Sequence, residues 1–193
     1  METHGIPNDL LLQVNVVAVM IFLPIVEKFL YPFLRKHNIN FSIINRMVVG
    51  FLFEALAMAY AALLQRLVYS AGPCYDAPLA CPASDNGTIP NRIHVAAQVP
   101  IYFLEGLAEI FAAPAALQFA YIKAPVNMKS TLQALLNVTG ALSALIGIAL
   151  SPMYKDPRFV ITYSLLAGLM FAALCLVLWI FWGRDKPDNE DEH

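Results

Sequence analysis

Five long apolar stretches occupy most of this sequence, and they constrain the fold more than any other feature. Each is about 20 residues or longer, the length that an α-helix needs to cross the hydrocarbon core of a bilayer. The stretches cover residues 10–33, 44–70, 95–122, 129–151 and 159–182. Hydrophobic residues make up 59% of the chain and charged residues only 13%, against about 25% charged in a typical soluble domain. No alternating pattern of membrane strands competes with them, so we predict an all-α integral membrane protein with about five transmembrane helices.

The distribution of Lys and Arg predicts the orientation in the membrane, because cytoplasmic loops carry an excess of basic residues. Eight of the 12 Lys and Arg residues fall on one side of the predicted spans. They are Lys28, Arg35, Lys36, Arg46, Lys123, Lys129, Arg184 and Lys186. The other side has Arg66, Arg92, Lys155 and Arg158. The protein is therefore expected to be multi-pass, with a cytoplasmic C-terminus and an external loop between the second and third spans.

That predicted external loop contains two cysteines and a glycosylation sequon. Cys74 and Cys81 are candidates for a disulfide, which requires an oxidising compartment, and two free thiols are the alternative. Asn86 begins the sequon Asn-Gly-Thr and is a glycosylation candidate, although a sequon can also occur by chance. Cys175 lies inside the last apolar stretch and is expected to be a packed apolar residue.

The stretch "LEGLAEIFAAPAALQFAY" contains two carboxylates at membrane depth. Glu105 and Glu109 are four residues apart and therefore share one face of a helix. Two carboxylates in a medium of low dielectric cannot both be charged cheaply, so such a pair can hold and release a proton. The alternative is a carboxyl group hydrogen-bonded to a neighbouring helix. Glu54 has no partner on its own predicted helix.

A proline follows these acids within the same predicted helix. Pro114 lacks the amide that would bond to the carbonyl of Ile110. In a membrane, a freed carbonyl is tolerated only against protein or a water-lined cavity, which favours a binding cavity or a gate at this point. A simple packing kink is equally compatible with the sequence.

The sequence contains no pattern that indicates enzyme chemistry. The sequence lacks a nucleophile elbow, a phosphate-binding glycine loop and a zinc motif. The four histidines fall in loops or at the ends, without metal-ligand neighbours at useful spacing. We therefore predict no enzymatic activity, no metal, no cofactor and no nucleic-acid partner.

Three segments of the sequence are distinctive: "THGIPNDLL", "INRMVVGFLFEALAMAYAALLQ" and "EIFAAPAALQFAYIKAPVNMKS". They resemble the proton-dependent oligopeptide transporter family of the major facilitator superfamily, and most closely its fungal branch. The most specific part is "FAYIKAPVNMKS", which resembles the family signature that ends in Ala-Pro, two variable residues and Met-Lys-Ser. The resemblance covers about residues 3 to 183.

This resemblance implies that the chain forms part of a larger fold. The family has twelve transmembrane helices in two halves, and the stretches here resemble helices eight to twelve. Residues 1–183 would form a carboxy-terminal transporter half that lacks its first helix, and residues 184–193 a cytoplasmic acidic tail. By position, Glu109 matches an acidic cavity residue associated with the amino terminus of the peptide, and Asn15 matches a polar cavity residue. Glu105 matches a position that is usually apolar in the family, so its role as proton-coupling candidate rests on spacing alone.

The expected function follows from the resemblance. The chain would be the carboxy-terminal portion of a proton-coupled symporter of di- and tripeptides in the plasma membrane, inactive alone, with Pro114 as a gating candidate. Its partners would be small peptides, protons, the lipid bilayer and the missing amino-terminal half. A truncated membrane protein that binds or regulates without transporting is the alternative interpretation.

Overall fold

The structure is a computed structural model that describes residues 1–2, 8–37, 39, 41–77, 81–85, 89–125 and 128–181. Its long helices are α1 (Asn8–Ile25), α3 (Ile43–Ser70), α4 (Val99–Lys123), α5 (Lys129–Leu150) and α6 (Phe159–Phe181). A π-helical turn (Val26–Leu30) and the short α2 (Tyr31–Lys36) continue α1. Among the described residues, the only strand-like pairing is an isolated bridge between Glu2 and His94.

The prediction of an all-α protein with five transmembrane helices is confirmed. Five helical segments are long and apolar enough to cross a membrane, and their bounds agree with the predicted stretches to within three residues. The segments are Gln13–Lys36, Ile43–Ser70, Val95–Lys123, Lys129–Leu150 and Phe159–Phe181. Residues 182–193, which include the predicted acidic tail, lie outside the described residues.

The first span is composite, a feature that the sequence analysis did not predict. Pro24 lies inside α1 and has no amide to donate to the carbonyl of Met20. The π-helical turn begins two residues later, and Pro32 occupies the first turn of α2. A widened turn next to a proline is a common way to absorb a break in the helical hydrogen-bond ladder.

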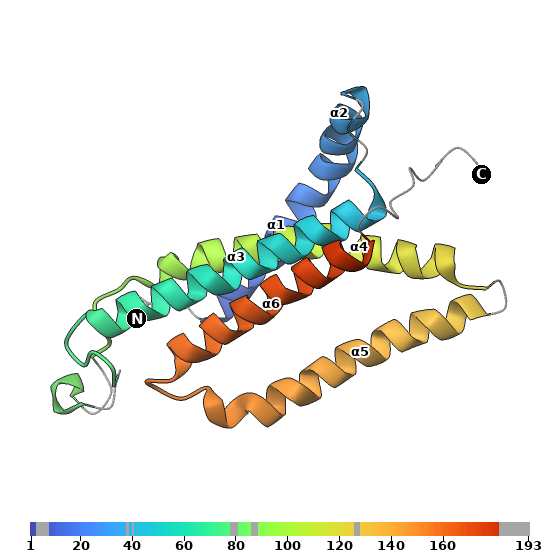
Figure 1. Cartoon of the computed structure of the whole chain (residues 1–193). Coiled ribbons are helices and arrows are strands. Elements are labelled where there is room, and N and C mark those ends of the chain that lie inside the picture. Colours follow the sequence, from blue (N-terminus) through green and yellow to red (C-terminus); the bar gives the residue numbers. More distant parts are fainter. Residues whose placement is uncertain are drawn as a thin grey trace.

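Helix α3 is the centre of the bundle, because it packs extensively on both α4 and α6, while α1 packs on α4 (Figure 1). Gly50 marks the closest approach of α3 to α4. A Cβ atom at Gly50 would lie 2.6 Å from the Ala112 Cβ atom and 2.8 Å from its backbone nitrogen, so only glycine fits here. Small residues at a crossing let the backbones of membrane helices approach and gain dispersion contacts. Next to this crossing, Phe53 of α3 stacks on Phe111 of α4 with ring centroids 5.9 Å apart.

Helix α5 lies apart from the other long helices (Figure 1). Its contacts are with α4 and with the turn that follows it, and none of its side chains is buried. Leu145 and Ile148 are 63% and 71% exposed. Among the described residues, no helix packs along the length of α5.

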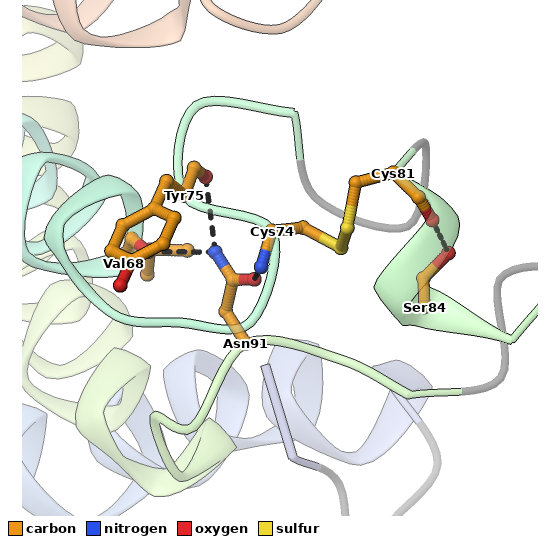
Figure 2. Close-up of a disulfide and its surroundings, with 6 residues drawn as sticks. All are labelled: Val68, Cys74, Tyr75, Cys81, Ser84 and Asn91. Carbon is orange, nitrogen blue, oxygen red and sulfur yellow. Dashed lines mark hydrogen bonds between the residues drawn. A yellow bond between two sulfur atoms is a disulfide. The ribbon is translucent and has the colours of Figure 1, made fainter.

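The connection between α3 and α4 is organised by one buried amide and one disulfide (Figure 2). Asn91 is 0% exposed; its Nδ2 atom donates to the carbonyls of Val68 at 2.8 Å and Tyr75 at 3.1 Å. Its Oδ1 atom accepts from the amide of Cys74 at 3.1 Å, and Cys74 is bonded to Cys81. The buried amide thereby ties the end of α3 to the loop. Asn86 lies outside the described residues.

Candidate functional site

Polar side chains from three helices gather around the middle of α4. Glu105 and Glu109 lie one turn apart on α4, ten or more residues from its C-terminal end. Asn15 approaches from α1 and Glu54 from α3. Each of these side chains lies inside a segment that can cross a membrane, where ionisable groups usually face a protein interior or an aqueous cavity.

Asn15 and Glu109 are joined across the crossing of α1 and α4. The Nδ2 atom of Asn15 donates to the Oε1 atom of Glu109 at 3.4 Å, and Glu109 itself is exposed. Gly106 makes this approach possible, because a Cβ atom there would lie 3.1 Å from the Ala18 Cβ atom and 3.2 Å from the Asn15 Oδ1 atom. The structure therefore brings together two residues that are 94 positions apart in the sequence and that we predicted to bind substrate.

The other polar atom of the Asn15 amide is not satisfied by the described residues. Its Oδ1 atom is buried against Gly106 and accepts no hydrogen bond. A buried acceptor without a donor costs about 1–3 kcal/mol. Such atoms are few in native structures, and rotation of the amide toward a donor would remove this cost.

Glu54 belongs to the same group of acids, which sequence spacing did not reveal. Its carboxylate interacts electrostatically with Glu109, and that of Glu105 interacts with both Glu54 and Glu109. Glu54 and Glu105 are half-buried. Because Glu54 is about fifty residues from the other two acids, only the packing of α3 on α4 brings the three together. Among the described residues, no Lys, Arg or His pairs with any of these three carboxylates.

Two tyrosines extend the group toward α6. Tyr102 lies one turn before Glu105 on α4, and Tyr163 lies near the start of α6. Both hydroxyl groups interact electrostatically with Glu105. Sequence reasoning missed both tyrosines, since a tyrosine near the end of a membrane span is ordinary and nothing in the spacing links Tyr163 to Glu105.

Pro114 lies on the exposed surface of α4, five residues beyond Glu109. Helix α4 remains α-helical on both sides of the proline and does not end there. Pro114 removes one donor from the helix, as expected, without dividing it into two elements.

This arrangement can hold a cation or a proton within the membrane. Three carboxylates without a basic partner attract positive charge, and the low dielectric of their surroundings strengthens that attraction. No group of three or more His, Cys, Asp or Glu side chains in the described part of the chain has the geometry to hold a metal ion.

Comparisons with known proteins agree on one family. The model of the POT family matches residues 1–172. A peptide transporter of Candidozyma auris, PTR_A, is 47% identical over 192 residues, which cover 100% of this chain and 32% of that protein. The peptide transporter PTR2 of Saccharomyces cerevisiae is 42% identical over 100% of this chain and 30% of its own length. The peptide transporter imqD of Aspergillus flavus is 41% identical over 100% of this chain and 47% of its own length.

A solved structure shows the same fold. A crystal structure described as an auto inhibited POT family peptide transporter superposes with a TM-score of 0.59 at 20% sequence identity. The superposition covers 93% of this chain and 34% of that chain. The chain thus spans about a third of the length of the C. auris and S. cerevisiae relatives and of this structure.

Proposed function

Because the chain belongs to the POT family, we propose that it is the carboxy-terminal portion of a proton-coupled symporter of di- and tripeptides. The observation that carries this proposal is the contact between Asn15 and Glu109 next to two further carboxylates at membrane depth. The names of the fungal relatives support peptides as the substrate class.

Glu109 is proposed to bind the ammonium group of the peptide. Its carboxylate is exposed and has no basic partner among the described residues. A substrate ammonium can supply the positive charge, and a charge pair in a site of low dielectric is stronger than one at a protein surface. The Asn15 amide is proposed to bind the polar groups of the peptide backbone, because it offers both a donor and an acceptor without adding charge.

Glu105 is proposed to couple proton binding to transport. It is half-buried between two other carboxylates, so taking up a proton relieves repulsion within the group. Glu54 shares this environment and is the second candidate for the same proton. The exposed Pro114 is proposed to give α4 the deformability that a gate needs, since it removes one hydrogen bond from the helix.

Transport is proposed to require the rest of the transporter. In carriers built from two halves, the substrate site lies between the halves, and one half rocks against the other. The proposed location is the plasma membrane, with residues 1–183 in the carboxy-terminal half and residues 184–193 in the cytoplasm.

The orientation has its own test. The loop between α3 and α4 is proposed to be external, which fits its Cys74–Cys81 disulfide and the sequon at Asn86. We expect a glycosidase to shift the electrophoretic mobility of the wild-type chain and to leave Asn86→Gln unchanged. Protection of a loop tag from external protease in intact cells, with cleavage of a C-terminal tag, would reverse the proposed orientation.

The substrate role of Glu109 is tested in a completed transporter. We would fuse the amino-terminal portion of the 47%-identical C. auris transporter to this chain and measure dipeptide uptake in a transport-deficient yeast. A hydrogen bond to a charged group contributes about 1.5–3 kcal/mol, so Glu109→Gln should lower uptake at least 10-fold. In Glu109→Gln, uptake of a peptide with a blocked amino terminus should fall less than uptake of a peptide with a free amino terminus.

Glu27→Gln is the matched control, because Glu27 is exposed in the π-helical turn and lies outside the group of acids. We expect it to leave uptake unchanged. Glu54→Gln should have an intermediate effect on uptake and alter its dependence on external pH. Equal uptake by wild type and Glu109→Gln would remove Glu109 from the substrate site.

A further inference from the structure

The last three turns of α3 form a groove that the proposed transport site does not use. Its volume is about 410 Å³, within the range of about 300–1,000 Å³ typical of ligand sites. It is lined by Tyr60, Leu63, Leu64, Arg66, Leu67 and Ser70. Leu64 is only 5% exposed and forms the floor, while Leu63 and Leu67 are 62% and 56% exposed and form the walls.

The length of the groove matches one leaflet of a bilayer. Residues 60 to 70 extend about 15 Å along a helix at 1.5 Å per residue. This is half of the roughly 30 Å hydrocarbon core. Since α3 ends at Ser70, the groove runs back along the helix from the end of a membrane span.

A single cation lies at the end of the groove that is nearest to water. Arg66 is exposed and lies one turn before the end of α3. No ion pair or hydrogen bond joins its guanidinium group to another residue in the part of the chain that the structure describes. The hydroxyl of Tyr60, at the other end of the groove, donates to the carbonyl of Ala97 and so fixes that end against the start of the next span.

We propose that this groove binds one acyl chain of a phospholipid while Arg66 pairs with its phosphate. A guanidinium group matches a phosphate with two parallel hydrogen bonds, and the apolar walls match the acyl chain. The site is separate from the carboxylates around α4 and does not depend on the proposed transport.

Charge argues against a second copy of this chain as the occupant. A twofold contact through this face would place the same patch on both subunits and bring the two Arg66 side chains toward each other. Like charges in such a contact destabilise it. A phosphate instead neutralises the cation.

The experiment measures lipid preference at the groove in vesicles. Leu67→Trp places a fluorescent reporter on the exposed wall, and Trp179→Phe with Trp182→Phe removes the two natural tryptophans. Quenching is compared between brominated phosphatidylcholine and brominated phosphatidylglycerol. We expect about a fivefold preference for phosphatidylglycerol, which corresponds to about 1 kcal/mol for one Arg near a membrane surface.

The variants separate a specific site from a general effect of charge. Arg66→Gln should bring the preference to about one, and Arg66→Lys should give an intermediate preference, because it keeps the charge and loses the bidentate geometry. Arg158→Gln is the matched control, since Arg158 is also exposed and basic but does not line the groove, and it should keep the full preference. Circular dichroism of each variant verifies that the helices are retained.

Three results would overturn the proposal. They are equal quenching by the two lipids with Arg66 present, equal loss of preference in Arg66→Gln and Arg158→Gln, and absence of quenching by any brominated lipid. The last would show that acyl chains do not enter the groove. The assay requires no peptide uptake, so its outcome is distinguishable from failure of the transport proposal.

Discussion

Helices α4 and α5 are consecutive spans of similar length, yet they pack in opposite ways. Helix α4 packs on α1 and α3 and has five buried residues, whereas α5 has none and lies apart (Figure 1). Both are apolar enough to cross a membrane. Hydrophobicity therefore decides that both helices belong in the bilayer, but it does not decide which of them finds a partner within this chain.

The difference between α4 and α5 lies in what the small residues of each helix contact. A Cβ atom at Gly106 of α4 would lie 3.1 Å from the Ala18 Cβ atom and 3.2 Å from the Asn15 Oδ1 atom of α1, closer than ordinary van der Waals contact, so the missing side chain permits a close helix crossing. Apart from the backbone of α5 itself, no described atom lies within 4 Å of where a Cβ would lie at Gly140 or Gly147. The same residue type marks a contact in one helix and open space in the other, because membrane helices associate through close packing rather than through hydrophobicity.

The largest effect should come from completing the transporter. We expect no proton-driven dipeptide uptake above background from this chain alone in a transport-deficient host. The fusion to the C. auris amino-terminal portion should transport, because α5 and the acids around α4 would then face the second half of a two-half carrier. Uptake by the chain alone, with surface expression matched by immunoblot, would show that the unpartnered α5 needs no further half.

A smaller effect, on the stability of this chain alone, distinguishes the packed α4 from the exposed α5. Gly50→Ala at the α3–α4 crossing places a Cβ 2.6 Å from that of Ala112, and overpacking of this kind should destabilise the fold by about 1–3 kcal/mol. Gly147→Ala on α5 is the matched control and should be neutral or stabilising by up to about 1 kcal/mol. The measurement is the apparent midpoint of thermal unfolding in detergent. Equal midpoints for the two variants would contradict the observed packing.

Most of the fold could be predicted from the sequence, because span length and hydropathy are local properties. The π-helical turn Val26–Leu30 was not predicted, although Pro24 was a visible signal for a disturbed helix. The buried Asn91 was also missed. Its role depends on carbonyls at the end of α3 and in the loop, 23 and 16 residues away respectively, which no periodic pattern specifies.

The candidate site could be predicted only in part. Glu105 and Glu109 follow from helical spacing, and Asn15 is a polar residue within a predicted span to which the family resemblance adds a cavity role; the structure places it against Glu109. Glu54 and Tyr163 join these residues through the packing of α3 and α6, which is long-range information. The substrate and proton roles of these residues remain predictions.

The smallest effect on stability is expected from a substitution on the exposed face of α5. This substitution also gives the most detailed test of how α5 differs from the packed helices. Leu145 is 63% exposed, so Leu145→Ala should change the unfolding free energy of the chain alone by less than about 0.5 kcal/mol. Leu174 of α6 is 7% exposed, and Leu174→Ala should cost about 2–5 kcal/mol because it leaves a cavity.

The same pair of variants behaves differently if a second half covers α5. In the completed transporter, Leu145→Ala should then cost about 2 kcal/mol or more, while the cost of Leu174→Ala stays unchanged. The apparent unfolding midpoints of both variants, measured in both proteins, decide this. A Leu145→Ala cost that is small in both would place this face of α5 against lipid, where loss of a side chain leaves no cavity because lipid tails fill the space.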